Sequence, residues 1–185
     1  AAEEHDTAMA AVLKVDSKTV EALCENIDGI YPVNYNSPVQ TVVSGTKEAL
    51  AEFKIKAAEE KARVIDLAVS AAFHSPYMNN AAEGFAKYLS DLKTDSLRMP
   101  VYANYTAQPY DSDIMSVLTK QMNNPVRWCD TVKNMIADGY TDFIEAGAGK
   151  TLCGLIKKIS SDVRVYSVEN EETLNQTIEA VKANA

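Results

Sequence analysis

A histidine at the end of a strand-like segment is the residue of this sequence best placed to do chemistry. Residues 69–76 read VSAAFHSP, and His74 is one of only 2 histidines among 185 residues. Histidine changes its charge near neutral pH, so a histidine on the turn after a strand is a candidate general base or acid. A lone histidine is nevertheless more often a core or surface residue than a catalyst. The local pattern leaves both interpretations open.

Four further segments accompany this one, and their order along the chain is informative. They are residues 34–45 (NYNSPVQTVVSG), 101–107 (VYANYTA), 121–128 (QMNNPVRW) and 143–152 (FIEAGAGKTL). In this order, and together with the segment that holds His74, they resemble the C-terminal part of the malonyl-CoA:acyl carrier protein transacylases. The resemblance covers about residues 8–159, most of the chain. The ordered set is far more specific than any single segment.

The expected fold class is α/β, in two parts. The resemblance implies a ferredoxin-like βαββαβ small subdomain at residues 7–69, followed by the C-terminal part of an α/β-hydrolase-like, parallel-sheet acyltransferase core at residues 70–185. Residue periodicity predicts the same six elements for the first part without the resemblance. After residue 70, helices alternate with strands, which predicts a parallel and covered sheet. The resemblance implies that the central strands of this sheet come from the N-terminal part of the enzyme, which these segments do not include.

Periodicity and capping residues place the individual elements. In the first part we expect strands at 9–15, 30–36, 41–43 and 63–69, and helices at 18–26 and 46–61. In the second part we expect strands at 100–104, 141–146 and 163–168, and helices at 79–92, 112–122, 126–137, 150–159 and 171–183.

The resemblance assigns roles to four residues of the site. It makes His74 the general base, with its ring oriented by a main-chain carbonyl at the position of Gln121. A neutral carbonyl fixes the tautomer of the ring without stabilising the imidazolium as strongly as a carboxylate would. Phe73 and Asn36 are the expected substrate-binding residues. Without the resemblance, Gln121 is an exposed residue at a helix end, Asn36 begins an Asx turn, and Phe73 packs under the loop.

Three family motifs are missing from this sequence. They are a Gly-Gln-Gly loop, a Gly-His-Ser-x-Gly nucleophile turn and a segment with the arginine that holds the malonyl carboxylate, all of which precede the matched segments in the family. The sequence contains the base without the nucleophile. It begins with Ala1 rather than methionine, which suggests a cleaved polypeptide or a fragment. We therefore expect this chain to be inactive alone and to have the missing N-terminal half of the same enzyme as a partner.

The resemblance implies an acyltransferase of fatty acid biosynthesis. The complete enzyme would move malonyl from malonyl-CoA to the phosphopantetheine thiol of acyl carrier protein through an acyl-serine intermediate, with no cofactor. Two alternatives stay open: a non-catalytic module that binds carrier protein or CoA, and a fragment of a polyketide synthase acyltransferase domain. A Gly-His-Ser-x-Gly turn elsewhere in the parent gene would separate an enzyme from a binding module.

Composition excludes several classes of partner. A formal net charge of −8 argues against nucleic acid, because nucleic-acid binders need a basic surface. The sequence has no Cys-x-x-Cys motif and no histidine pair, so we expect no metal. The three cysteines, Cys24, Cys129 and Cys153, are widely spaced among apolar residues, which predicts reduced thiols in a cytoplasmic protein. The longest apolar run is far too short to span a membrane.

A glycine-rich turn at residues 147–151, GAGKT, invites a different interpretation. Strand, glycine turn, Lys-Thr and helix are the parts of a phosphate-binding loop. The spacing does not fit, because that motif requires glycine where this chain has Ile144. We interpret the segment as a tight turn between a strand and a helix, in which glycine lets the backbone approach its neighbours.

Overall fold

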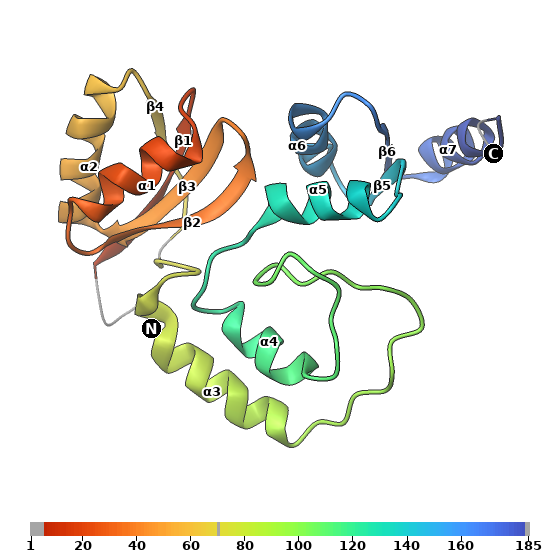
Figure 1. Cartoon of the computed structure of the whole chain (residues 1–185), viewed down its shortest axis with the longest axis horizontal. Coiled ribbons are helices and arrows are strands. Elements are labelled where there is room, and N and C mark those ends of the chain that lie inside the picture. Colours follow the sequence, from red (N-terminus) through yellow and green to blue (C-terminus); the bar gives the residue numbers. More distant parts are fainter. Residues whose placement is uncertain (1–5, 70, 184–185) are drawn as a thin grey trace. The chain divides into compact units, whose positions relative to one another are not determined.

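The computed structural model describes residues 6–69 and 71–183, and the chain divides into two compact units, Ala1–Thr131 and Val132–Ala185 (Figure 1). The first unit contains an antiparallel sheet and the second a parallel pair of strands. The protein is therefore mixed α/β, as the sequence predicts. The boundary expected between residues 69 and 70 stays a prediction. No helix in the described part of the chain is long and apolar enough to cross a membrane.

The sheet of the first unit has four strands in the order β2-β3-β1-β4. They are β1 (Thr7–Leu13), β2 (Ile30–Ser37), β3 (Gln40–Thr46) and β4 (Arg63–Asp66). All neighbouring strands are antiparallel, with Ala10 of β1 opposite Val43 of β3 and opposite Asp66 of β4. β4 is shorter than the strand expected at 63–69: residues 63–66 pair with β1, and the N–H of Leu67 makes one further bond, to the carbonyl of Met9 at 3.0 Å.

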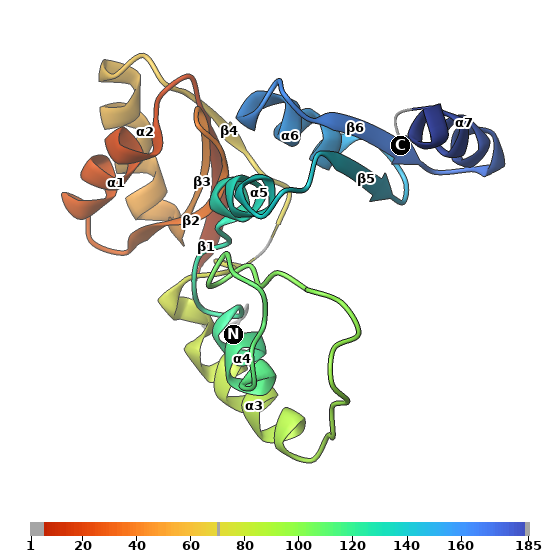
Figure 2. The ribbon, with the colours of Figure 1, turned by 45° about the vertical axis from the view of Figure 1, so that its right-hand side comes forward.

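Two helices, α1 (Ser17–Glu25) and α2 (Lys47–Glu59), cover one face of this sheet (Figures 1 and 2). Each begins at a side chain that accepts a backbone hydrogen bond: Asp16 from Thr19 at 2.8 Å and Thr46 from Ala49 at 3.1 Å. An apolar core lies between the helices and the sheet, and its largest fully buried side chain is Phe53. The six elements between residues 7 and 66 follow the order that periodicity predicts.

One close contact in this sheet requires glycine. A Cβ atom on Gly45 would lie 2.2 Å from the carbonyl oxygen of Gly29, well inside the limit of any real contact. The chain enters β2 at Gly29, which has a φ of +84°, and it passes directly over β3 there. Glycine at 45 therefore lets the α1–β2 connection lie on the sheet.

The rest of the first unit consists of short helices and long connections. After a 3-10 turn at Pro76–Met78 come α3 (Asn79–Ser90), α4 (Ile114–Lys120) and the start of α5 (Trp128–Ala137). α3 and α4 lie side by side (Figures 1 and 2). The strand expected at 100–104 is wrong. Its backbone bonds within its own loop instead, with Ala103 N–H donating to Gln108 and Tyr110 N–H donating to Val101 at 2.9 and 2.8 Å.

The segment that precedes α5 joins the edge of the sheet. Val126 N–H donates to Val33 at 2.8 Å, and Tyr35 N–H donates to Val126 at 2.9 Å, which pairs Val126 with β2 in parallel. The helix expected from residue 126 therefore begins at Trp128, because the backbone of Val126 is already used by β2. The next residue, Arg127, donates its N–H to Asn104 at 2.9 Å.

The second unit contains β5 (Asp142–Ala146), α6 (Thr151–Ile159), β6 (Arg164–Val168) and α7 (Glu171–Ala183). β5 and β6 pair in parallel along their whole length, as expected for these two strands. Arg164 binds Asp142 across the pair with two hydrogen bonds of 2.5 Å. This guanidinium lowers the pKa of Asp142 to about 2.

Candidate functional site

The turn that carries His74 is held in an uncommon backbone conformation. His74 has a φ of +61°, in the left-handed region that residues other than glycine rarely adopt. The buried hydroxyl of Ser75 donates to the carbonyl of Ala72 at 2.6 Å and accepts from Tyr77 N–H at 3.3 Å. These bonds fix both sides of the turn. Strained positions persist where the surrounding structure determines them strongly, and they cluster at functional sites.

Tyr77 ties this turn to the sheet. Its hydroxyl donates to the carbonyl of Gly29 at 3.3 Å, and its ring meets Tyr31 of β2 edge to face, with ring centres 6.1 Å apart. The turn is thus held in contact with the first residues of β2 and the residue before them. A rigid sheet can in this way position a loop residue such as His74.

The structure brings His74 and Gln121 together, although they are 47 residues apart. Nδ1 of His74 lies 2.8 Å from the main-chain carbonyl oxygen of Gln121. A carbonyl can only accept, so Nδ1 must carry the hydrogen of this bond. In the neutral ring Nε2 is then the free acceptor. This is the atom that a general base needs, and the contact agrees with the one expected from the sequence; the catalytic roles of both residues stay predictions.

Gln121 is half-buried rather than exposed, and both polar atoms of its side-chain amide are hydrogen-bonded. It caps the C-terminus of α4. Its Oε1 accepts from the backbone N–H of Asn104 at 3.0 Å, and its Nε2 donates to the hydroxyl of Tyr110 at 2.8 Å. The loop of residues 101–110 therefore holds the residue whose carbonyl faces His74.

The two expected substrate-binding residues differ in their placement. Phe73 precedes His74 directly, and 40% of its surface is exposed, so it does not pack as a buried core residue. Asn36 lies half-buried within β2, beside an irregularity in the pairing with β3. No hydrogen bond in the described part of the chain joins Asn36 to His74. Substrate binding by Phe73 and Asn36 stays a prediction.

Sequence reasoning missed Tyr110, whose hydroxyl bonds to the side chain of Gln121. Tyr110 lies in a loop without periodicity, and the partner of its side-chain hydroxyl, Gln121, is 11 positions away. Nothing in its immediate neighbourhood signals that contact. The Gly-free loop closes on its own backbone, with Ala107 at a φ of +58°.

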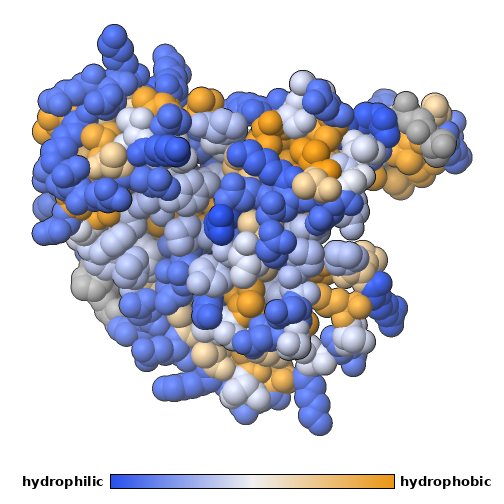
Figure 3. Space-filling model, in the orientation of Figure 1, coloured by the Kyte–Doolittle hydropathy of each residue, from blue (hydrophilic) through white to orange (hydrophobic). Residues whose placement is uncertain are grey.

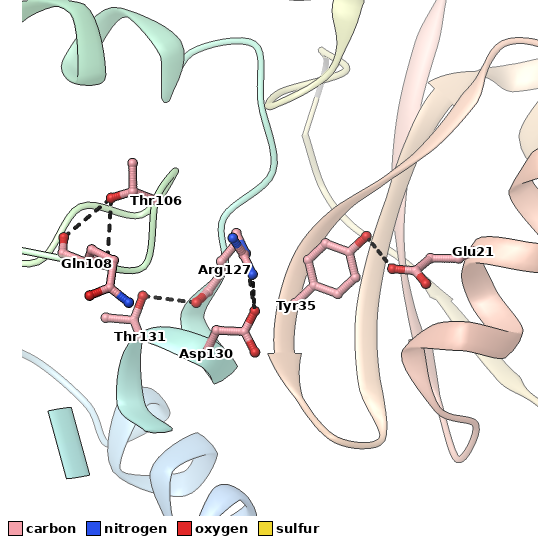
Figure 4. A network of polar contacts seen from close by, with 7 residues as sticks. All are labelled: Glu21, Tyr35, Thr106, Gln108, Arg127, Asp130 and Thr131. Atoms are coloured by element: carbon pink, nitrogen blue, oxygen red, sulfur yellow. Dashed lines mark hydrogen bonds and ion pairs between the residues drawn. The ribbon is translucent and has the colours of Figure 1, made fainter. Parts of the chain in front are cut away.

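A second polar network holds the chain just after Gln121 (Figure 4). The guanidinium of Arg127 bonds to Asp130 at 2.8 Å, and the hydroxyl of Thr131 donates to the carbonyl of Arg127 at 2.9 Å. Across from Arg127, the hydroxyl of Tyr35 donates to Glu21 at 2.8 Å. Burial and this carboxylate raise the pKa of Tyr35, so its phenol remains neutral and keeps donating. The segment from 121 to 131 is therefore fixed at both ends.

The glycine turn of the second unit has an acidic partner. The carboxylate of Glu145 accepts from the backbone N–H groups of Cys153 and Leu152 at 2.8 and 3.1 Å, at the start of α6. These bonds, Cys153 first, lower the pKa of Glu145. A bound phosphate would need the same donors and would meet a negative charge. The geometry supports a capped structural turn over a phosphate-binding loop.

Other features of the described residues add no second site of this kind. No group of three or more His, Cys, Asp or Glu side chains among them could hold a metal ion. All three cysteines are buried thiols that take part in no disulfide bond. A cavity of about 400 Å³ lies between α1 and the start of β2, and its lining does not include His74 or Gln121.

Comparison with known proteins gives a consistent result. The pattern of the acyl transferase domain matches residues 2–179. The malonyl CoA-acyl carrier protein transacylase of Staphylococcus aureus is 38% identical over 181 residues, which are 94% of this chain and 56% of that protein. The crystal structure of the malonyl CoA-acyl carrier protein transacylase from Clostridium perfringens matches with a TM-score of 0.92 and 34% identity, over 96% of this chain and 58% of that one.

A further solved structure is a type II polyketide synthase acyl-carrier protein in complex with its malonyl-transacylase. It matches with a TM-score of 0.93 and 30% identity, over 97% of this chain and 60% of that one. The chain thus spans little more than half the length of the relatives it matches.

Proposed function

Because the chain belongs to the acyl transferase domain family, we propose that it supplies the general base of a malonyl-CoA:acyl carrier protein transacylase of fatty acid biosynthesis. The observation that carries the proposal is the 2.8 Å contact between Nδ1 of His74 and the carbonyl of Gln121. It leaves Nε2 of a neutral imidazole free to accept a proton. The cytoplasmic location expected from the sequence is part of the same proposal.

The proposed reaction needs one histidine to move a proton in each direction. Nε2 of His74 takes the hydroxyl proton of a serine as that oxygen attacks the thioester of malonyl-CoA. The resulting imidazolium gives the proton to the departing CoA thiolate, which leaves malonyl on the serine. In the second half-reaction Nε2 takes the proton of the phosphopantetheine thiol as its sulfur attacks the carbonyl of malonyl-serine. The bond between that carbonyl and the serine oxygen then breaks, malonyl stays on the sulfur, and the imidazolium returns the proton to the serine oxygen. The carbonyl of Gln121 keeps the ring in position throughout and carries no net charge.

We propose that the serine comes from polypeptide outside the segments described above, since the sequence has no Gly-His-Ser-x-Gly turn. We infer that residues 7–69 form a ferredoxin-like subdomain and residues 70–185 the C-terminal part of an α/β-hydrolase-like core. The partner polypeptide would correspond to the remainder of the relatives' length. Exposed apolar side chains of strands and loops support this, among them Ile144 at 54% and Val101 at 42%. Figure 3 shows hydrophobic residues among hydrophilic ones on the face that it draws. Such side chains usually mark contact surfaces when they gather in patches.

Within this proposal Phe73 and Asn36 contact the acyl group. Phe73 is next to the base in sequence and is exposed enough to border a pocket. Asn36 would contribute an amide from β2. Malonyl-CoA and acyl carrier protein are the proposed partners.

A non-catalytic module that binds carrier protein or CoA is the second candidate, and the missing nucleophile motif favours it. A polyketide pathway is a variant of the first candidate, since one matching structure is a malonyl-transacylase of a type II polyketide synthase. Measurements of malonyl transfer distinguish both alternatives from the first candidate. A binding module transfers no malonyl in any context, and a polyketide enzyme prefers its own carrier protein.

The test uses a chimera in which this chain replaces the matching part of the Staphylococcus aureus transacylase. Labelled malonyl-CoA and carrier protein are supplied to the chimera and to the 185-residue chain alone. We expect the chimera to label the carrier protein and the chain alone to label none. A folded chimera that leaves the carrier protein unlabelled would favour the binding module.

A further inference from the structure

The phenol of Tyr110 lies two hydrogen bonds away from His74. Its hydroxyl accepts from Nε2 of Gln121 at 2.8 Å, and the carbonyl of the same glutamine faces Nδ1 of His74 at 2.8 Å. The orientation of the amide is not arbitrary. Asn104 presents a backbone N–H, at 3.0 Å, which requires the oxygen of the Gln121 amide on that side. The amide nitrogen must then point at Tyr110.

The carbonyl of Gln121 needs such support because of its place in the fold. The last carbonyls of a helix have no partner within the helix, and a helix as short as α4 (Ile114–Lys120) is marginal by itself. The position of this carbonyl therefore depends on tertiary contacts. The side chain of Gln121 supplies two of them, to Asn104 and Tyr110. Burial raises the pKa of Tyr110, which keeps its hydroxyl protonated at neutral pH.

We propose that Tyr110 is a positioning residue for His74 and acts through Gln121. With Tyr110 in place, the carbonyl of Gln121 accepts from Nδ1 and leaves Nε2 free to receive a proton. Without it, the end of α4 moves more freely and the imidazole populates the tautomer with its hydrogen on Nε2, which cannot act as a base at that atom. The inference rests on the proposed function, since acyl transfer gives His74 its proton to move.

The test reads the tautomer directly and needs no activity. The chain is labelled with ¹⁵N-histidine, and His5→Ala removes the only other histidine signal. At a pH where the ring is neutral, the ¹⁵N shifts of Nδ1 and Nε2 give the ratio of the two tautomers. We expect the Nδ1–H form to predominate, and Tyr110→Phe to lower the ratio about fivefold, the size of one ordinary hydrogen bond.

Tyr105→Phe is the matched control. Tyr105 lies in the same loop and has no bond to Gln121, and its ring stays under the ammonium of Lys120, 5.8 Å away, when the hydroxyl is removed. This variant should keep the wild-type ratio. A fall of the same size in Tyr105→Phe and Tyr110→Phe would overturn the proposal, because the effect would then belong to the loop in general.

A second variant covers the case in which Tyr110→Phe disturbs folding. Gln121→Met removes both amide bonds and keeps the main-chain carbonyl, so it should lower the ratio at least as far. A dispersed amide spectrum identifies the folded variants. An unchanged ratio in a folded Tyr110→Phe or Gln121→Met chain overturns the proposal. An inactive chimera with the expected ratios would contradict the proposed function alone, so the two failures are distinguishable.

Discussion

Two loops of this protein end in hydrogen-bond networks built from different groups. In the first unit, His74 meets the carbonyl of Gln121, whose amide is held by uncharged partners. In the second unit, the carboxylate of Glu145 accepts from two backbone N–H groups at the start of α6. Both loops follow a strand. The first is held by Gln121, 47 positions away in the sequence, and the second by bonds from Glu145 to backbone groups on the far side of the turn.

The difference concerns charge. A carboxylate at a helix N-terminus is stabilised by the N–H groups and the helix dipole, so it strengthens a turn and fills the site where an anion would bind. An uncharged carbonyl beside an imidazole fixes one tautomer and adds little to the stability of the imidazolium. The carboxylate of Glu145 suits a structural role, and the carbonyl beside His74 suits a group that must take up and release a proton repeatedly.

Replacing His74, the proposed general base, should have the largest effect. In the chimera, His74→Ala should lower the rate of malonyl transfer on the order of a hundredfold or more, because general acid–base catalysis is lost in both half-reactions. Glu145→Gln should leave the rate within about twofold, since a structural cap takes no part in proton transfer. Steady-state transfer assays measure both variants, and His5→Ala is the control. Equal losses of transfer rate in the His74 and Glu145 variants would contradict the distinction between a catalytic and a structural network.

Substrate selection should be the next largest effect. Phe73→Ser in the chimera should let methylmalonyl-CoA compete better with malonyl-CoA, because in the proposed site the ring of Phe73 lies beside the acyl group and leaves no room for an added methyl. Overpacking of this kind costs about 1–3 kcal/mol, or roughly fivefold to a hundredfold in the ratio of kcat/KM values. Direct competition between the two thioesters measures it. An unaltered ratio of kcat/KM values in a folded variant would contradict the proposed contact between Phe73 and the acyl group, and Phe73 would then be an ordinary surface residue.

The charged cap should make the second unit sensitive to acid. The folded-state pKa of Glu145 is lowered, so its stabilising effect is present above the pKa of the unfolded chain and is lost as pH falls through the folded value. The Tm of the wild-type chain should therefore exceed that of Glu145→Gln at pH 7, and the gap should narrow below about pH 4. Circular dichroism melts over this range provide the measurement. A gap that is independent of pH would mean that the charge of the cap contributes nothing.

The exposed pair of Asp142 and Arg164 should show a smaller effect of the same sign. Its carboxyl has a pKa of about 2, so the advantage of wild type over Asp142→Asn should persist at pH 4 and disappear toward pH 2. Exposed ion pairs contribute little to the free energy of unfolding, so the shift in Tm should be small. Added salt should reduce it further. A large shift that salt does not change would show that this pair acts as a buried one.

The fold of residues 7–66 could be predicted from the sequence because local signals agree there. β-Branched runs alternate with helical stripes, and Asp16 and Thr46 cap the two helices close to the expected helix starts at residues 18 and 46. The loop of residues 101–110 could not be predicted. Its apolar start reads as a strand, but the partner for its backbone is the loop itself, with Tyr110 bonded to Val101. Propensity carries no information about such a partner.

The candidate site was predictable only through the ordered set of segments. Spacing alone left His74 ambiguous and made Gln121 an ordinary helix end. Their contact joins residues 47 positions apart, which no local pattern encodes. Tyr110 and the pairing of Val126 with β2 escaped prediction for the same reason, since both depend on tertiary contacts.

The most direct test of the central claim is a through-bond measurement on the 185-residue chain. With ¹⁵N-histidine and a ¹³C-labelled carbonyl at Gln121, a scalar coupling across the hydrogen bond connects Nδ1 of His74 to that carbonyl. We expect the coupling to be present, with the proton of the neutral ring on Nδ1 and Nε2 unprotonated. A proton on Nε2 and no coupling to Gln121 would contradict the assignment of His74 as a base held by an uncharged carbonyl.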